Sequence, residues 1–255
     1  MNIFSPEYPD RFLLFAPSHI ITMIVIGAVW IAVPLALRKG ISEATDRKIR
    51  YSMALVLVGQ YLGWMLWEAL TGRFGMQLSL PLNLCDFTNF LLAIMLVNKS
   101  PRLFEILYFW ALAGTIQSYI TPNITYPFPH FEFFVFYLQH GGEILAILYF
   151  VFVLKYRPRP LSIAKAYGWL LVFVVAIYVF NLLTESNYMF LMADTPNPST
   201  ITKMIALFGA PPRHMIGLAI VALVSIIVLY VPWVVVDVKR GRQSSGELGS
   251  EGYTG

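Results

Sequence analysis

One cysteine and four histidines are the side chains of this chain that are best suited to covalent or acid–base chemistry. Cys85 is the only cysteine, and a thiol becomes a strong nucleophile when a nearby base accepts its proton. Imidazole is the most common general base near neutral pH. The combination predicts nucleophilic chemistry at Cys85, but a cysteine in an apolar environment also serves as a small packing residue. Both interpretations remain open from the residue types alone.

The composition limits the class of protein in which these residues act. The 255 residues are 58% hydrophobic and 13% charged, whereas about a quarter of the residues in soluble domains are charged. The mean hydropathy is +0.67. The net charge of +4 is a small excess and does not indicate a nucleic-acid partner. A single cysteine excludes an internal disulfide, a cysteine-rich zinc finger and an iron–sulfur cluster. The composition predicts an integral membrane protein.

Seven apolar windows are long enough to cross a hydrocarbon core of about 30 Å as helices. They lie near 12–37, 51–72, 79–98, 103–121, 132–154, 162–184 and 215–237. The first window lacks the basic flank and small-residue cleavage site of a signal peptide. We therefore expect an all-α polytopic membrane bundle that forms one domain over residues 1–242. Residues 243–255 are expected to be a disordered tail or a remnant of cloning.

The distribution of basic residues predicts the orientation of the bundle. Fourteen of the eighteen Lys and Arg residues fall in alternate connections, between spans one and two, three and four, five and six, and after span seven. Short cytoplasmic loops carry the positive excess in membrane proteins. We therefore expect the N-terminus outside, the C-terminus in the cytoplasm, and the protein in the cell membrane.

Polar side chains gather in the extracytoplasmic halves of the predicted spans. Such side chains are costly in hydrocarbon and normally face a cavity or the bundle interior. The sequence therefore predicts a polar cavity that opens outward. Its expected lining and supporting residues, in addition to Cys85 and His140, are His19, Glu68, Asn83, Asp86, Asn89, Gln117, Glu143, Asn187 and His214.

His140 is the preferred base because it lies roughly 9 Å deep in its predicted span. Glu143, three residues later on the same helix face, or a helix carbonyl would orient the ring. Alternatively, His140 only makes a hydrogen bond between helices, and His214, His130 and His19 are the other candidate bases. Asp86 points about 100° away from Cys85 on a helix, so we expect it to pair with another helix.

The histidines and carboxylates could also bind a metal ion or relay protons in a transporter. The histidines and carboxylates include ligand types that zinc accepts, but no His-x-x-x-His or His-Glu-x-x-His spacing occurs, so no metal and no cofactor is expected. Intramembrane carboxylates and histidines also mark proton relays in transporters. The polar residues stop short of the cytoplasmic half, and no inverted repeat is visible, so a path through the membrane has little support.

Several segments resemble signature segments of the YwaF-like integral membrane proteins of bacteria. They are Pro81-Leu-Asn-Leu-Cys-Asp-Phe, Gln117-Ser-Tyr-Ile-Thr-Pro, Phe128-Pro-His-Phe-Glu-Phe-Phe, Gln139-His-Gly and Asn187-Tyr-Met-Phe-Leu. The resemblance extends from about Phe12 to Val236. Animal relatives, the transmembrane protein 164 family, are described as acyltransferases that place a fatty acyl chain on ether lysophospholipids through a cysteine nucleophile, and Cys85 matches that cysteine. His140 is similarly placed to the histidine of the androgen-induced lipid hydrolases.

The resemblance implies a membrane-embedded, cysteine-dependent acyltransferase that moves an acyl chain from a phospholipid to a lysophospholipid. His140 would deprotonate Cys85, and side-chain amides of Asn83, Asn89 or Gln117 would stabilise the oxyanion. Water as acceptor would make the same site a lipase. The alternative function is a non-enzymatic protein that binds or transports a lipid or small molecule in a His/carboxylate cavity. The expected partners are membrane phospholipids and lysophospholipids, with no nucleic acid, and the sequence does not determine the oligomeric state.

Overall fold

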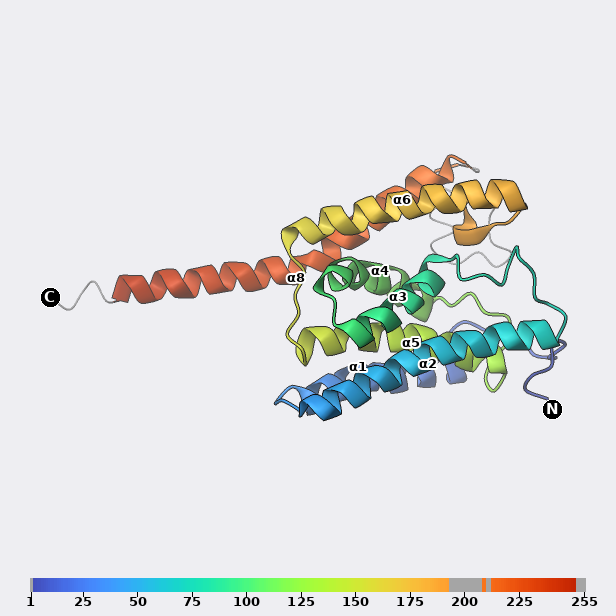
Figure 1. The fold of residues 1–255 in the computed structure, drawn as a ribbon, viewed down its shortest axis with the longest axis horizontal. Coiled ribbons are helices and arrows are strands. Elements are labelled where there is room, and N and C mark those ends of the chain that lie inside the picture. Colours follow the sequence, from blue (N-terminus) through green and yellow to red (C-terminus); the bar gives the residue numbers. More distant parts are fainter. Residues whose placement is uncertain (1, 193–207, 210–211, 251–255) are drawn as a thin grey trace.

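The computed structural model describes residues 2–192, 208–209 and 212–250, with side chains up to residue 239. Helices account for most of these ranges, and the ranges contain no strand (Figure 1). The helices are α1 Pro17–Leu37, α2 Glu43–Leu70, α3 Leu84–Asn98, α4 Pro101–Ile120, α5 Phe131–Phe152, α6 Pro160–Thr184, the short 3-10 helix η1 Tyr188–Phe190, and α8 His214–Ser250.

Six of these helices, all except α3 and η1, are long and apolar enough to cross a membrane. The chain is therefore a multi-pass helical membrane protein, as the composition predicts. The count of seven spans depends on α3, which has 15 residues and a length of about 22 Å. That length is less than the hydrocarbon thickness of about 30 Å. The predicted orientation stays a prediction, and so does the tail at 243–255, whose side chains lie outside the described residues.

The third span is shorter than the predicted 79–98 because its first residues form turns instead of a helix. The residue before a proline is disfavoured in the helical conformation, which discourages a helix through Leu80 and Pro81. Asn83 has an extended backbone and is the N-cap of α3. At the other end, Lys99 adopts the left-handed conformation with φ 54° and ends α3. The Ser100 hydroxyl then accepts a hydrogen bond from the Leu103 N–H and caps α4.

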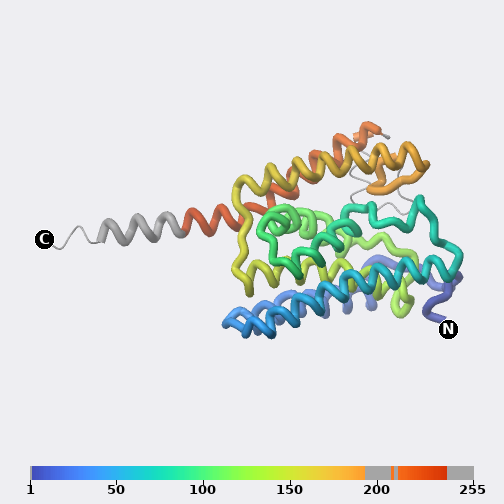
Figure 2. The backbone as a smooth tube through the Cα atoms, in the orientation of Figure 1, coloured from blue at the N-terminus to red at the C-terminus, as the bar shows by residue number. Residues whose placement is uncertain are grey.

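The bundle has α4 and α5 at its centre. α4 contacts α3, α5, α6 and α8, while α5 contacts α1, α2, α3 and α4. α1 and α2 lie on one side of the bundle, α6 and α8 lie on the other, and α8 continues past the end of the bundle (Figure 1). The loops at 71–83, 121–130 and 185–192 lie at the same end as the N-terminus (Figure 2). We call this end the N-terminal end of the bundle.

A buried ion pair ties α2 to α3 and α5 at the opposite end. α2 begins at Glu43, eight residues earlier than the predicted span, so that Asp46 and Arg50 lie inside it. Arg50 Nε donates to Asp46 Oδ2 at 3.0 Å, and its Nη1 donates to the Leu96 carbonyl of α3. The Tyr149 hydroxyl of α5 donates to Asp46 Oδ1 at 2.7 Å. This network links α2, α3 and α5 at the end of the bundle that is away from the N-terminus.

Replacing Arg50 with methionine is expected to destabilise the fold by less than the about 3 to 5 kcal/mol of a fully broken buried pair, because Asp46 loses its buried partner but keeps Lys99, whose Nζ lies 2.7 Å from Asp46 Oδ2. Arg50 is 4% exposed. The free energy of unfolding in mixed detergent micelles measures the effect. Arg47→Met is the matched control, since Arg47 lies on the same helix and is exposed. Equal loss of stability in both variants would show that the Asp46–Arg50 pair has no special role.

Candidate active site

Cys85 lines a cavity of about 480 Å³ at the N-terminal end of the bundle, which we call the cysteine pocket. Helices α2, α3, α4 and α5 form its walls, and η1 and α8 each contribute to one side. The lining residues with polar side chains are Tyr61, Trp64, Glu68, Asn83, Cys85, Asp86, Ser118, Asn123, Glu132, Gln139 and His140. The pocket thus combines the predicted nucleophile and the predicted base with apolar walls that suit a lipid chain.

Cys85 lies in the first turn of α3, at the second helical position after the N-cap Asn83. The span predicted at 79–98 would have placed the thiol deeper in the helix. Peptide dipoles make the first turn of a helix electropositive, and this effect falls off within one turn. The shorter α3 therefore places Cys85 within the turn in which the helix dipole acts.

The backbone N–H groups at the start of α3 are free to bind an anion. The first N–H groups of an α-helix have no acceptor within the helix. In the described part of the chain, the N–H groups of Leu84, Cys85 and Asp86 donate to no protein atom, and the Asn83 side chain does not cap them. The first intrahelical bond runs from the Phe87 N–H to the Asn83 carbonyl. Such free N–H groups are suited to hold an oxyanion that forms next to Cys85.

Helix α4 supplies the surroundings of the sulfur. A β-carbon added at Gly114 would lie 3.4 Å from Cys85 Sγ, so the glycine leaves room for the thiol. The hydroxyl groups of Thr115 and Ser118 flank the sulfur on the same helix. Gly114 is a site residue that was not predicted from the sequence. The available signal is its place directly before Thr115, the first of the polar residues in the last turns of α4.

A chain of hydrogen bonds fixes the carboxylates around the thiol. Gln139 Nε2 of α5 donates to Asp86 Oδ1 at 3.0 Å and to Glu143 Oε1 at 3.4 Å. Thr115 Oγ1 donates to Glu143 Oε2 at 2.6 Å, and Asn83 Nδ2 donates to Asp86 Oδ2 at 3.0 Å. Asp86 therefore joins α3 to α5, as expected from its direction on the helix. The network holds the start of α3 against the two central helices.

His140 has the protonation pattern of a base. Its Nδ1 lies 2.8 Å from the Phe136 carbonyl, which can only accept a hydrogen bond, so the neutral ring carries its proton on Nδ1. Nε2 then has a free lone pair. The ring stacks on Phe136 with centroids 4.0 Å apart. A helix carbonyl, and not Glu143, orients the ring. His140 and Cys85 line the same pocket, but no hydrogen bond joins these two described side chains.

The other three histidines do not line the cysteine pocket, and each is bonded to the backbone elsewhere. His19 Nδ1 accepts from the Phe15 N–H at 3.0 Å. His130 Nδ1 accepts from the Glu132 N–H at 3.1 Å, and its Nε2 donates to the Ser5 carbonyl at 3.1 Å. His214 Nε2 donates to the Phe190 carbonyl at 2.8 Å. His19 and His214 therefore lie outside the lining of the cysteine pocket, while the bond from His214 to Phe190 joins this histidine to a residue of the pocket wall.

His130 makes stability depend on pH. Burial lowers the pKa of this histidine, which caps α5 from the loop before it. At pH values below the ordinary histidine pKa of about 6.5, the folded state then binds fewer protons than the unfolded state. Stability is expected to be complete above that pH and to fall as the pH decreases through it. Melting curves at several pH values measure this slope, and His130→Gln should flatten it. An unchanged slope in the variant would contradict the assignment.

The remaining predicted site residues divide between the pocket and its surroundings. Glu68 and Asn83 line the pocket, and Glu68 Oε2 is buried without a hydrogen-bond partner among the described residues. Asn89 lies one turn below Cys85 and donates to the Leu57 carbonyl at 2.8 Å, while Gln117 donates to Thr121 at 2.6 Å. Asn187 is the N-cap of η1. Of the three amides predicted to stabilise an oxyanion, only Asn83 lines the pocket.

η1 forms a wall of the pocket that the residue pattern did not reveal. Met189 and Phe190 line the pocket, and both have left-handed backbone conformations with φ near 57° and 55°. Asn83 Oδ1 accepts from the Met189 N–H at 3.0 Å, which joins this wall to the start of α3. Tyr188 donates to the Met76 carbonyl at 2.9 Å. Side chains separated by more than a hundred residues therefore define the same end of the pocket.

The model of the TMEM164 family matches residues 14–230, which include the helices from α1 to η1 and the whole cysteine pocket. The chain belongs to the TMEM164 family. No curated protein and no solved structure matches the chain.

The pocket of this TMEM164-family protein brings together a cysteine in the first turn of a helix, a histidine with a free ring nitrogen, and unpaired backbone N–H groups. Among the described residues, no three histidine, cysteine or carboxylate side chains gather as a metal site.

Proposed function

We propose that this TMEM164-family protein is a cysteine-dependent acyltransferase that moves a fatty acyl chain between membrane phospholipids. The observation that supports it most directly is the placement of the single cysteine in the first turn of α3, inside a pocket that also holds His140. A packing cysteine needs neither free N–H groups nor a histidine beside it. The family membership and the resemblance to cysteine acyltransferases support the same function.

In the first half-reaction, His140 Nε2 accepts the proton of the Cys85 thiol. The thiolate attacks the carbonyl carbon of a phospholipid acyl ester, and a C–S bond forms. The N–H groups of Leu84, Cys85 and Asp86 donate to the oxyanion, each at a scale of about 3 kcal/mol. Collapse of the tetrahedral intermediate breaks the ester C–O bond, and the protonated His140 gives its proton to the leaving lysolipid oxygen. The products are an acyl thioester on Cys85 and a lysophospholipid.

In the second half-reaction, the hydroxyl of an acceptor lysophospholipid gives its proton to His140 and attacks the thioester. The C–S bond breaks, and the Cys85 thiolate recovers the proton from His140. The acceptor becomes a phospholipid, so no net change in oxidation or charge occurs. Acyl-CoA is a cytosolic donor, whereas the orientation predicted from the basic loops puts Cys85 on the outer side. A bilayer phospholipid is therefore the proposed donor.

Intact-mass spectrometry of the purified protein after incubation with mixed phospholipids tests the thioester. We expect an acyl adduct on the wild type that hydroxylamine removes, and none on Cys85→Ala. The mass of the adduct identifies the transferred chain. A wild-type protein without an adduct, and with a thiol that a lipophilic electrophile does not label, would contradict the proposal and favour a binding or transport function. Free fatty acid as the main product would indicate hydrolysis in place of transfer.

A further inference from the structure

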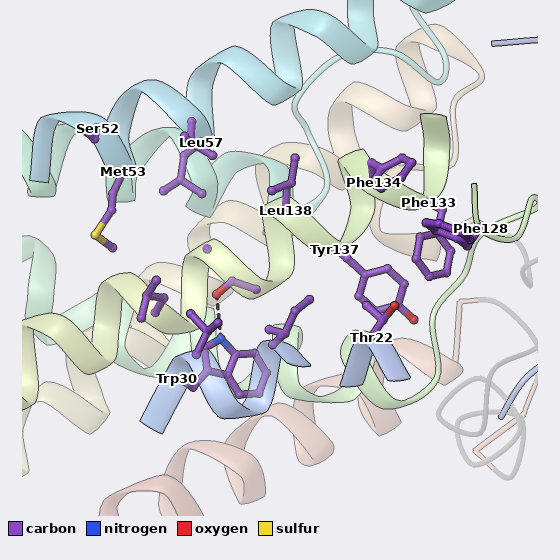
Figure 3. Close-up of a pocket in the computed structure, with 16 residues that line it drawn as sticks. Thr22, Trp30, Ser52, Met53, Leu57, Phe128, Phe133, Phe134, Tyr137 and Leu138 are labelled. Atoms are coloured by element: carbon purple, nitrogen blue, oxygen red, sulfur yellow. Dashed lines mark hydrogen bonds between the residues drawn. The ribbon is translucent and has the colours of Figure 1, made fainter. Parts of the chain in front are cut away.

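A second cavity, of about 460 Å³, lies on the opposite face of α5 from the cysteine pocket. α1, α2 and α5 form its walls, and Phe128 lies at its end nearest the N-terminal loops (Figure 3). We call it the α1–α2 groove. Its sides include Ile26 and Val29 from α1 and Met53 and Val56 from α2. Neither Cys85 nor His140 lines it, so it is distinct from the proposed active site.

The groove exists because α1 packs on α5 and not extensively on α2. Two consecutive glycines of α5 form its floor. A β-carbon at Gly141 would lie 3.1 Å from the Ile26 side chain, and one at Gly142 would lie 2.9 Å from Leu57. Trp30 Nε1 donates to the Gly141 carbonyl at 2.8 Å, which anchors α1 to this floor (Figure 3). The glycines let α1 and α2 approach α5 closely, while the space between α1 and α2 stays open.

The dimensions of the groove match one extended hydrocarbon chain. Along α5 it reaches from Phe133 to Leu145, a rise of about 18 Å at 1.5 Å per residue. That is close to one half of a hydrocarbon core of about 30 Å. A volume of about 460 Å³ spread along this length makes an elongated space, whose shape matches an extended alkyl chain.

The surroundings of the groove determine what can fill it. Only His19 and Pro34 of α1 are buried, and the groove-lining side chains Val29 of α1 and Val56 of α2 are themselves exposed at the outside of the bundle. The groove therefore opens into hydrocarbon, where an empty apolar cavity loses dispersion contacts. Its lining has few polar side chains, namely Thr22, Ser52, Trp30 and Tyr137. A hydrophobic tail satisfies such a lining, whereas a polar head group does not.

We propose that the α1–α2 groove binds one fatty acyl chain of a phospholipid from the leaflet at the N-terminal end of the bundle. The chain enters beside Phe128, at the level of the loops, and runs along the glycine floor toward Leu145. The lipid head group stays outside the groove. The bound chain completes the packing between α1 and α2, and it lies on the back of the helix that carries His140.

A photoactivatable phosphatidylcholine, with a diazirine in its acyl chain, tests this site in vesicles of ordinary phosphatidylcholine. We expect cross-links on the groove side chains Leu138 and Leu145 that saturate with probe, in contrast to non-saturating labelling of Val25. Val56→Trp fills the groove and should reduce labelling of Leu145 about tenfold. Leu55→Trp is the matched control, since Leu55 is also exposed on α2 but does not line the groove. In the Leu55→Trp variant, Leu145 should be labelled to the same extent as in the wild type.

Native mass spectrometry gives a second readout. The wild type and Leu55→Trp should keep one phospholipid after exchange into detergent, and Val56→Trp should not. If Val56→Trp does not give a monodisperse helical protein, Leu138→Trp fills the same space from α5 and takes its place. The proposal would be overturned if labelling of Leu145 does not saturate with probe, or if it persists in Val56→Trp. Either result would show that Leu145 only contacts bulk lipid. The site is independent of acyl transfer, so Cys85→Ala should keep it.

Discussion

Cys85→Ala is expected to lose acyl transfer by a factor on the order of 10⁶, down to the background rate, as removal of the nucleophile does in other acyl-transfer enzymes. The loss is this large because the thiolate forms the covalent intermediate, and no other described side chain in the pocket is a thiol. The measurement uses vesicles that contain a phospholipid with an isotope-labelled acyl chain and an unlabelled lysophospholipid. Mass spectrometry of the lipids then counts transferred chains.

Cys85→Ser is the matched variant for shape, since only the sulfur is exchanged for oxygen. A hydroxyl is a much weaker nucleophile than a thiolate, so this variant should also be severely impaired while the pocket keeps its form. Both variants should unfold at the same temperature as the wild type within a few degrees, because the first turn of α3 keeps its backbone. Full activity in Cys85→Ser would eliminate the nucleophile role.

His140→Ala is expected to reduce the rate of acyl transfer by about 10²- to 10⁴-fold, the range for removal of a general base. The other described proton acceptors near the thiol, Asp86 and Glu143, are held by hydrogen bonds from Gln139, whereas His140 Nε2 makes no hydrogen bond within the described part of the chain. The rate at which a lipophilic electrophile labels Cys85 should fall as well. Initial rates in the vesicle assay, together with the labelling rate, measure both effects.

Added imidazole is the control for this prediction, since a small base can occupy the space that the side chain leaves. Partial recovery of both rates in His140→Ala, with none in Cys85→Ala, would support a base at this position. A variant that keeps the wild-type labelling rate but loses transfer would show that His140 acts on the lipid and not on the thiol. Loss of helical content would identify a folding defect instead.

The residue pattern predicted the membrane class and most of the helices because these features depend on local composition. Whether a window of apolar residues can cross the bilayer depends mainly on its own composition. The spans predicted at 103–121, 132–154 and 162–184 therefore agree closely with α4, α5 and α6. The third span was placed five residues too early. Leu80 donates its N–H to the Tyr188 hydroxyl at 2.9 Å, a contact with η1 that no window of sequence around α3 reveals.

The candidate site was predicted in outline and corrected in detail. The polar residues of several spans pointed to one end of the bundle, and Cys85 and His140 do line one pocket there. The sequence favoured His140 as the base but left His19, His130 and His214 open, since the residue types alone do not show which ring shares a pocket with the thiol. Their backbone partners, such as the Phe190 carbonyl for His214, come from distant segments. The free N–H groups of α3 were missed because they depend on where the helix begins.

Residue types are enough to identify this chain as a helical membrane protein with one thiol and a polar end, because the cost of placing a side chain in hydrocarbon depends on its type. Which polar residues meet depends on how the helices pack. Cys85 and His140 belong to different helices, and Gly114 and η1 are among the walls of the pocket that they share. The α1–α2 groove likewise arises from packing on Gly141 and Gly142, since a cavity is a property of several helices together.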